Sequence, residues 1–234
     1  MSNVAHRIKS QGGRSGSPAA GAGWYGRVSE VEAMLRNLCV EARRHAPAVV
    51  EAAERAVRTL RARASEYASS IHDASGVGSG ATDGSAGGGD THMSPAFMRS
   101  DDVLRPFLLA ASDGRPKTAP LATSALGSVQ RLIAMGAVAP QQAANIARVL
   151  AVQAARPSAG ATGSAASTLT SIRLRVLQTL PLLLSSGTFE LPMQLVRSAL
   201  SSCLLLYACK FDPVIHHTAS ATLRQVGSPP ILPP

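Results

Sequence analysis

Two adjacent histidines, His216 and His217, are the first residues that suggest a metal site. They stand in the segment DPVIHHTASATLRQV, residues 212 to 226, where small and apolar residues recur every three to four positions and form one face of a helix. Successive helical residues diverge by about 100°, so His217 should point outward while His216 flanks the buried face. Two rings placed in this way do not converge on one metal, and we predict no metal site. The residues of the buried face are Ile215, Ala219, Thr222, Leu223 and Val226.

The three cysteines, Cys39, Cys203 and Cys209, suggest neither a zinc site nor a disulfide framework. They form no C-x-x-C pair and their number is odd, whereas both kinds of site need regular spacing or pairing. We expect reduced core cysteines of a cytosolic protein.

Catalytic arrangements are also missing from the sequence. Serines are plentiful, but none stands in a G-x-S-x-G turn, and the fourteen acids suggest no enclosed carboxylate pair. The glycine-rich stretch 75–95 contains no lysine, which a phosphate-binding loop would need. We therefore predict no catalytic residues, no cofactor and no enzymatic activity.

The net charge of +9 raises nucleic acid and anionic membranes as partners. Part of the excess lies in residues 1–27, which contain no acid and are rich in glycine and serine, so we predict a disordered basic tail there. A transit peptide would have a similar composition, but no amphipathic helix is visible. Aromatic residues are only 3%, too few for the base stacking of single-strand binding, and we expect no nucleic acid. The longest apolar stretches are shorter than the roughly 20 residues of a membrane-spanning helix.

The elements that would position any site are helices. The chain is 45% hydrophobic, largely alanine and leucine, which favours helices packed through small side chains. Asp101 or Asp102 is expected to cap one helix, and Asp212, followed by Pro213, to cap another. The pattern of apolar residues predicts helices that span about 28–45, 47–64, 101–112, 118–135, 140–150, 169–184, 191–208 and 213–226.

Three of these helices can be superimposed. Aligning Val129, Leu177 and Leu223 also aligns Leu132, Leu180 and Val226, with offsets of 48 and 46 residues. Paired helices with a period close to this are typical of HEAT and armadillo repeats. We therefore predict an all-α, armadillo/HEAT-like right-handed α-solenoid of about seven to eight helices. It would span residues 28–226, with flexible insertions at 75–95 and 157–166 and a proline-rich disordered end at 227–234.

Several segments resemble the N-terminal domain of the Mon-two family, whose members are large trafficking scaffolds of the Golgi and endosomes related to the big Arf exchange factors. The resemblance covers most of residues 28–226, and the combination of LRPFLLA with ATLRQ is specific. The glycine-rich insertion before Asp101 departs from the family pattern, and GSPPILPP closes the chain where relatives continue. The segments are EARRHAPAVVEAAERAVRTLR (41–61), DDVLRPFLLA (101–110), SVQRLI (128–133), LRVLQTLPLLL (174–184) and DPVIHHTASATLRQV (212–226).

The resemblance implies a dimerisation and cyclophilin-binding (DCB) domain. Such a domain would form a homodimer and dock to an Arf-like small GTPase, which places it peripherally on trans-Golgi network and endosome membranes. Mon-two proteins lack the catalytic exchange domain of their relatives, so no catalytic residues are implied. The alternative function is a basic peripheral module that binds anionic lipid or nucleic acid directly, and an enzyme is the third class.

Binding residues in a solenoid are expected on the outward faces of successive second helices. With Val129 inward, Arg131 lies about 200° around the helix and should face solvent. Arg131 belongs to SVQRLI, one of the segments that carries the resemblance, and Lys117 is close to the start of the same predicted helix. We predict that Arg131, Lys117 and Gln130 contact the partner.

Overall fold

The computed structural model describes residues 22–76, 95–157, 163–185, 192–209 and 212–227, and these form helices without any strand. The predicted all-α class is therefore confirmed. Three short 3-10 turns, Ala96–Arg99, Pro116–Thr118 and Pro140–Gln142, precede α3, α4 and α5. The eight α-helices are α1 (Ala22–Ala42), α2 (Pro47–Gly76), α3 (Asp101–Ser112), α4 (Ala119–Ala134), α5 (Ala143–Ala154), α6 (Ser164–Ser185), α7 (Met193–Tyr207) and α8 (Pro213–Gly227).

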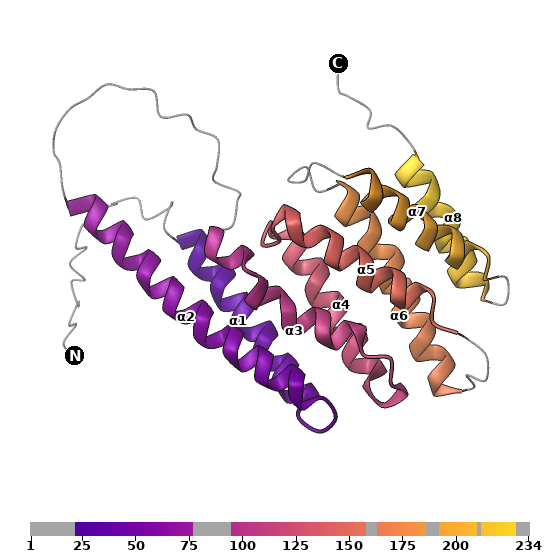
Figure 1. Cartoon of the computed structure of the whole chain (residues 1–234), viewed down its shortest axis with the longest axis horizontal. Coiled ribbons are helices and arrows are strands. Elements are labelled where there is room, and N and C mark those ends of the chain that lie inside the picture. The colour runs from indigo at the N-terminus through magenta and orange to yellow at the C-terminus, as the bar shows by residue number, and fades with distance from the viewer. Residues whose placement is uncertain (1–21, 77–94, 158–162, 186–191, 210–211, 228–234) are drawn as a thin grey trace, which may run out of the picture.

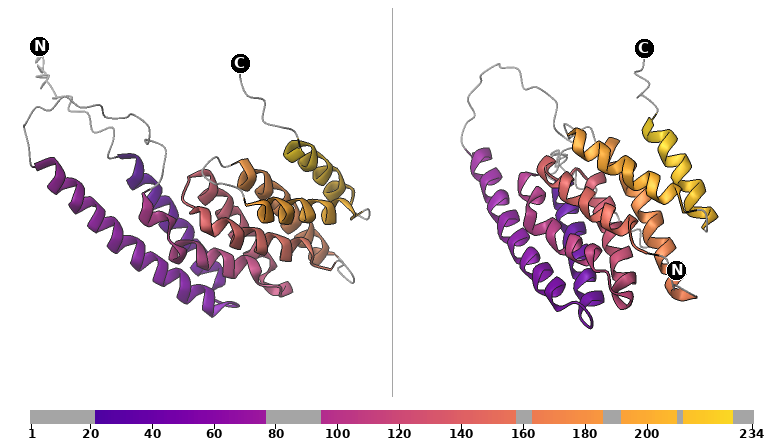
Figure 2. Two further views of the ribbon diagram at one scale, coloured as in Figure 1. Left: turned by 45° about the horizontal axis from the view of Figure 1, so that its top comes forward. Right: turned by 45° about the vertical axis from the view of Figure 1, so that its right-hand side comes forward.

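The helices form two layers that stack along one direction. In the first layer α1 packs on α4, α4 on α6, and α6 on α8. In the second layer α2 packs on α3, α3 on α5, and α5 on α7. Figure 1 shows this progression from indigo to yellow, and both views in Figure 2 show the same order. The arrangement confirms a solenoid-like fold, in which each pair of helices contacts mainly its neighbours.

The predicted repeat corresponds to a structural one. Helices α4, α6 and α8 are the second helices of the pairs α3–α4, α5–α6 and α7–α8, and all three lie in the first layer. Val129 and Leu177 are completely buried at the aligned position, while Leu223 in the last helix is partly buried. The repeat in the sequence therefore arises because each second helix covers the pair before it.

Small side chains allow the two layers to approach closely. Ala53, Ala110, Ala122 and Ala125 are fully buried between helices, whereas Phe107 is the one large aromatic ring among the fully buried side chains of the described residues. Helix axes can approach to about 8 Å only where such small residues meet. The alanine-rich composition thus produces a continuous core along the stack.

The structure corrects the predicted start of the domain. Helix α1 begins at Ala22 rather than near Val28, and the Trp24 side chain is only 8% exposed. Its ring packs edge-on against Tyr67 of α2 and Phe97, with centroid distances of 5.1 and 6.1 Å. This aromatic cluster extends the helix into a stretch that composition alone suggested was a tail.

Two other predicted boundaries also shift. Helix α2 continues to Gly76, so residues 75 and 76 belong to a helix and not to the insertion 75–95. Helix α6 begins at Ser164, within the predicted insertion 157–166. The remaining parts of the segments predicted to be flexible, residues 1–21, 77–94, 158–162 and 228–234, lie outside the described residues.

The predicted cap of α8 is confirmed, whereas the predicted cap of α3 is wrong. Asp212 caps α8 as predicted, because its Oδ1 accepts a hydrogen bond from the Ile215 backbone N–H at 3.3 Å. The N-cap of α3 is Ser100, so Asp101 and Asp102 lie in the first turn of that helix. There their charges still favour the positive end of the helix dipole, and Asp101 Oδ1 accepts a hydrogen bond from Gln142 Nε2 at 2.8 Å.

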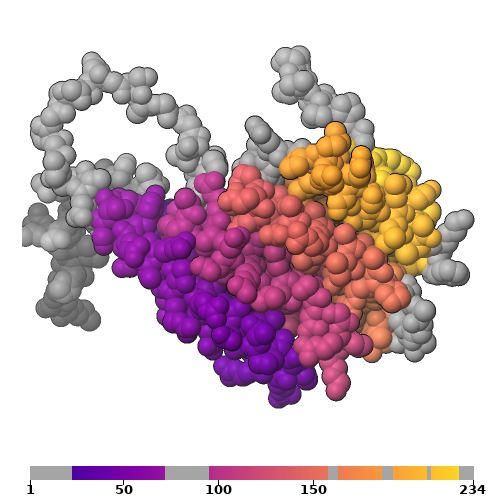
Figure 3. Space-filling model, viewed as in Figure 1, coloured from indigo at the N-terminus to yellow at the C-terminus, as the bar shows by residue number. Residues whose placement is uncertain are grey.

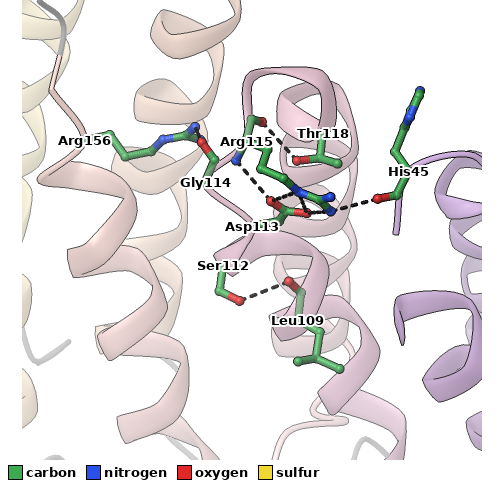
Figure 4. A network of polar contacts seen from close by, with 8 residues as sticks. All are labelled: His45, Leu109, Ser112, Asp113, Gly114, Arg115, Thr118 and Arg156. Atoms are coloured by element: carbon green, nitrogen blue, oxygen red, sulfur yellow. Dashed lines mark hydrogen bonds and ion pairs between the residues drawn. The ribbon is translucent and has the colours of Figure 1, made fainter. Parts of the chain in front are cut away.

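Arginines connect neighbouring helix pairs through the turns between their helices (Figure 4). Arg115 Nη2 donates to the backbone carbonyl of His45 at 2.8 Å, and Arg156 Nη2 donates to the carbonyl of Gly114. Arg173 Nη2 in turn donates to the carbonyl of Arg156 at 2.8 Å. Hydrogen bonds with a charged donor each contribute about 1.5–3 kcal/mol when they are protected from water, and less when exposed. The first two bonds link successive pairs, and the third holds α6 to the segment that follows α5 within one pair.

Candidate interaction surface

The positive charge is concentrated in the second half of the chain. Residues 114–234 contain ten lysines and arginines but only two acids, Glu190 and Asp212. The basic tail 1–27 contributes four lysines and arginines, so it accounts for the smaller part of the excess. The charge therefore lies mainly on the later helix pairs, where it can form part of a binding surface.

An open groove of about 850 Å³ lies on the first layer, between α1, α4 and α6. Most of the residues that line it have polar side chains, and several hydroxyl groups donate to carbonyl groups of their own helices. An open polar groove of this kind suits a protein partner better than an enclosed small molecule. The residues that matter below are Glu41 of α1, Gly127, Gln130 and Arg131 of α4, and Arg175 of α6.

Arg131 is exposed at this groove, on the side of α4 opposite to Val129, as predicted. Its side chain is 67% exposed, and Nη1 lies 3.3 Å from Glu30 Oε1 of α1. An exposed ion pair of this kind contributes at most about 1 kcal/mol to folding. The guanidinium is therefore available to a partner that can replace Glu30.

Gln130 lies at the contact between α4 and α6. Its Nε2 donates to the Arg175 carbonyl at 3.1 Å and to Thr179 Oγ1 at 3.0 Å. Its Oε1 accepts a hydrogen bond from Arg175 Nη1 at 3.1 Å. The side chain thus joins two helix pairs, and its proposed contact with a partner stays a prediction.

Lys117 and Arg131 mark opposite ends of α4. Lys117 is exposed in the turn Pro116–Thr118, fourteen positions before Arg131, which corresponds to about 21 Å along a helix. It lines a second hollow of about 310 Å³ together with Glu41 and His45. Glu41 and Ser124 line both hollows, so the surface continues along the seam between α1 and α4.

Arg175 also belongs to this groove, although sequence reasoning did not single it out. The repeat alignment pairs Arg175 with Gly127, since each precedes an aligned buried residue by two positions. A Cβ atom added to Gly127 would lie 3.9 Å from the Arg175 guanidinium carbon. The Arg175 side chain thus lies over Gly127 of α4, at a distance where a small side chain would be in ordinary contact with it.

The two histidines lie at different depths. His216 is partly buried and His217 is exposed, as their helix frame predicts. The His216 ring stacks on Tyr207 with centroids 4.4 Å apart, and its Nδ1 lies 2.7 Å from the Tyr207 carbonyl oxygen. His216 therefore connects α8 to α7. Within the described residues, no group of three histidines, cysteines or acids is placed to hold a metal ion.

The three cysteines are free thiols at helix contacts. Cys203 is buried, and this burial raises the pKa of its thiol to about 11. Cys39 is partly buried, and burial likewise raises the pKa of its thiol. Thiols with raised pKa values are poor nucleophiles near neutral pH, so Cys39 and Cys203 serve packing.

The stacked helix pairs and the open polar groove define this chain as an α-solenoid interaction domain. It belongs to the family of Mon2/Sec7/BIG1-like dimerisation and cyclophilin-binding (DCB) domains, whose family model matches residues 26–228. Comparison with curated proteins finds no match. The family assignment confirms the resemblance found in the sequence, and a DCB domain is a dimerisation and binding domain rather than a catalytic one. None of the described helices is long and apolar enough to span a bilayer.

Proposed function

We propose that this chain is a non-catalytic scaffold domain that self-associates and docks a GTP-loaded Arf-like small GTPase at Golgi or endosomal membranes. The family match supports a role in dimerisation and binding. The GTPase partner and the membrane location follow from the resemblance to Mon-two proteins. On this proposal the chain reaches the membrane through its partner.

The groove between α1, α4 and α6 is the proposed docking site for the GTPase. It combines an exposed arginine, Arg131, with acids on α1 and the guanidinium of Arg175 along one face. Arginine is enriched among the residues that dominate binding energy at protein interfaces. A partner that offers a carboxylate to Arg131 would displace the weak contact with Glu30.

Nucleotide-dependent retention tests this proposal. The purified chain is immobilised and incubated with Arf-like GTPases that carry either a non-hydrolysable GTP analogue or GDP. Retention of a GTP-loaded protein, with little retention of its GDP form, is the expected result. Equal retention of both forms would contradict docking to an activated GTPase.

Direct binding to an anionic surface is the second candidate function. It is favoured by the ten basic residues against two acids in residues 114–234. Binding to polyanions weakens steeply as salt rises, whereas a packed protein interface responds less. Flotation with phosphatidylserine vesicles at low and moderate salt, without any GTPase, separates the two functions.

A further inference from the structure

The first helices of the pairs, α3, α5 and α7, also superimpose. Each carries a buried aliphatic residue, then an exposed arginine two positions later, then another buried residue after two more. Because the burial pattern is the same, the three arginines occupy equivalent outward positions in the second layer. Figure 3 shows this layer, with α3 in magenta, α5 in salmon and α7 in orange. The aligned triplets are Val103, Arg105 and Phe107; Ile146, Arg148 and Leu150; and Leu195, Arg197 and Ala199.

This row of Arg105, Arg148 and Arg197, the arginine row, lies on helices with little negative charge. Helices α5 and α7 contain no acid, and the two acids of α3 are confined to its first turn. The ion pairs found among the described residues use Glu30, Glu32, Glu51 and Asp113, none of which pairs with this row. The row therefore presents a periodic positive charge.

A groove runs beside the row between α3 and α5. It has a volume of about 370 Å³ and includes both Arg105 and Arg148 along its edges, with one acid, Asp101, whose Oδ1 accepts a hydrogen bond from Gln142. Leu104 at 2% exposure forms its floor, and Val149 contributes a partly buried side. Asn145 also lines the groove, where its amide can bind a peptide backbone.

We propose that the arginine row and this groove bind an extended acidic peptide that crosses α3, α5 and α7. Neighbouring packed helices lie about 8–10 Å apart, and a chain extended in the polyproline II conformation advances about 3.1 Å per residue with three residues per turn. Every third side chain of such a peptide therefore lies on the same side, at about the spacing of one arginine per helix. The peptide carries acids at this spacing, with apolar side chains between them that contact the groove floor. This site lies on the opposite layer from the α1–α4–α6 groove.

The geometry favours a peptide over a lipid surface. The apolar floor at Leu104 lies below the arginines, where a flat bilayer surface does not reach. Helix α2 continues the same layer and exposes Glu51, Glu54 and Glu66 among its arginines, which an anionic bilayer would have to cover. Arginine also offers a planar fork that binds a carboxylate through two hydrogen bonds.

A designed peptide tests the proposal. The probe is a fluorescein-labelled twelve-residue peptide with the repeat Glu-Leu-Ser, and fluorescence anisotropy measures its affinity for the whole chain. Arg148→Glu should weaken binding at least tenfold, and Arg105→Glu and Arg197→Glu at least threefold each. Arg44→Glu, the same charge change at an exposed turn outside the row, should leave affinity unchanged. Circular dichroism checks that each variant is folded. If Arg148→Glu is not folded, Arg148→Gln takes its place.

Two further probes make the result decisive. A peptide with the same composition but four adjacent glutamates should bind more weakly, because its acids do not match the helix spacing. No binding of the Glu-Leu-Ser peptide, or equal losses in Arg44→Glu and Arg148→Glu, would overturn the proposal. A third result would also overturn it: Arg148→Glu abolishes binding to phosphatidylserine vesicles but leaves peptide affinity unchanged. The arginine row would then bind lipid.

Discussion

At the scale of single residues, the structure assigns several polar side chains to holding helix pairs together. Gln130, predicted from sequence to contact a partner, uses both ends of its amide within the molecule. Periodicity showed that its neighbour Arg131 faces outward, because that follows from one helix alone. It could not show the bonds of Gln130, because their partners are 45 and 49 residues away.

Gln130→Ala should therefore lower stability. The variant loses the hydrogen bonds that join α4 to α6, each with a net contribution of about 1 kcal/mol when partly protected from solvent. We expect the free energy of unfolding in urea to fall by about 1–2 kcal/mol. The exposed Gln178, at the aligned position of α6, provides the control, and Gln178→Ala should have little effect. Unchanged stability in Gln130→Ala would show that the bridge contributes nothing to folding.

Asp113 gives the fold a defined response to acid. The hydrogen bond from the Arg115 side chain is the main cause that lowers the pKa of Asp113 from 3.8 to about 2 (Figure 4). The ionised form is favoured in the folded protein, so its stabilising contribution is complete above about pH 4 and is lost as pH falls through about 2. Asp113→Asn should be less stable than the wild type by about 1 kcal/mol at pH 7. The difference should shrink between pH 4 and pH 2 in urea unfolding, and a constant difference would contradict the assignment.

At the scale of elements, sequence reasoning found the helices and their repeat because buried residues recur at helical spacing. It missed the first turns of α1, since Trp24 becomes part of the core only through Tyr67 and Phe97 on other segments. It also missed the arginines that bind backbone carbonyls between pairs, because a carbonyl acceptor leaves no mark in the sequence. Contacts between distant elements are therefore the part of the fold that local patterns do not reveal.

Helix α4 allows a direct test of the contact with α6. Glycine within a helix costs about 0.5–1 kcal/mol relative to alanine. The added Cβ of Gly127→Ala would lie 3.9 Å from the Arg175 guanidinium carbon, an ordinary contact distance. We expect this variant to be more stable than the wild type by about 0.5 kcal/mol in urea unfolding. Gly127→Leu should instead displace Arg175 and lower stability, and equal effects of the two variants would refute this packing.

At the scale of the whole molecule, the two layers separate two kinds of surface. The first layer carries the proposed GTPase site along α1, α4 and α6, and the second carries the arginine row on α3, α5 and α7. The composition predicts that the chain is basic. It does not predict how the basic residues are divided between the two layers, because that depends on which helices pack together. The family role predicts self-association, which light scattering would detect as a species of about twice the 24.1 kDa mass of the chain. A monomer over the whole accessible concentration range would contradict that prediction.

The central claim is that a GTP-loaded Arf-like GTPase docks at the α1–α4–α6 groove. The affinity of Arg131→Ala for this partner tests it most directly. Arg131 is exposed and its ion pair contributes little to folding, so its loss should affect binding alone. Titration calorimetry should show affinity at least tenfold weaker than that of the wild type, while the melting temperature stays nearly the same. Glu30→Ala, which frees the Arg131 guanidinium, should bind at least as tightly as the wild type. Unaltered affinity in Arg131→Ala would contradict the docking site at the α1–α4–α6 groove.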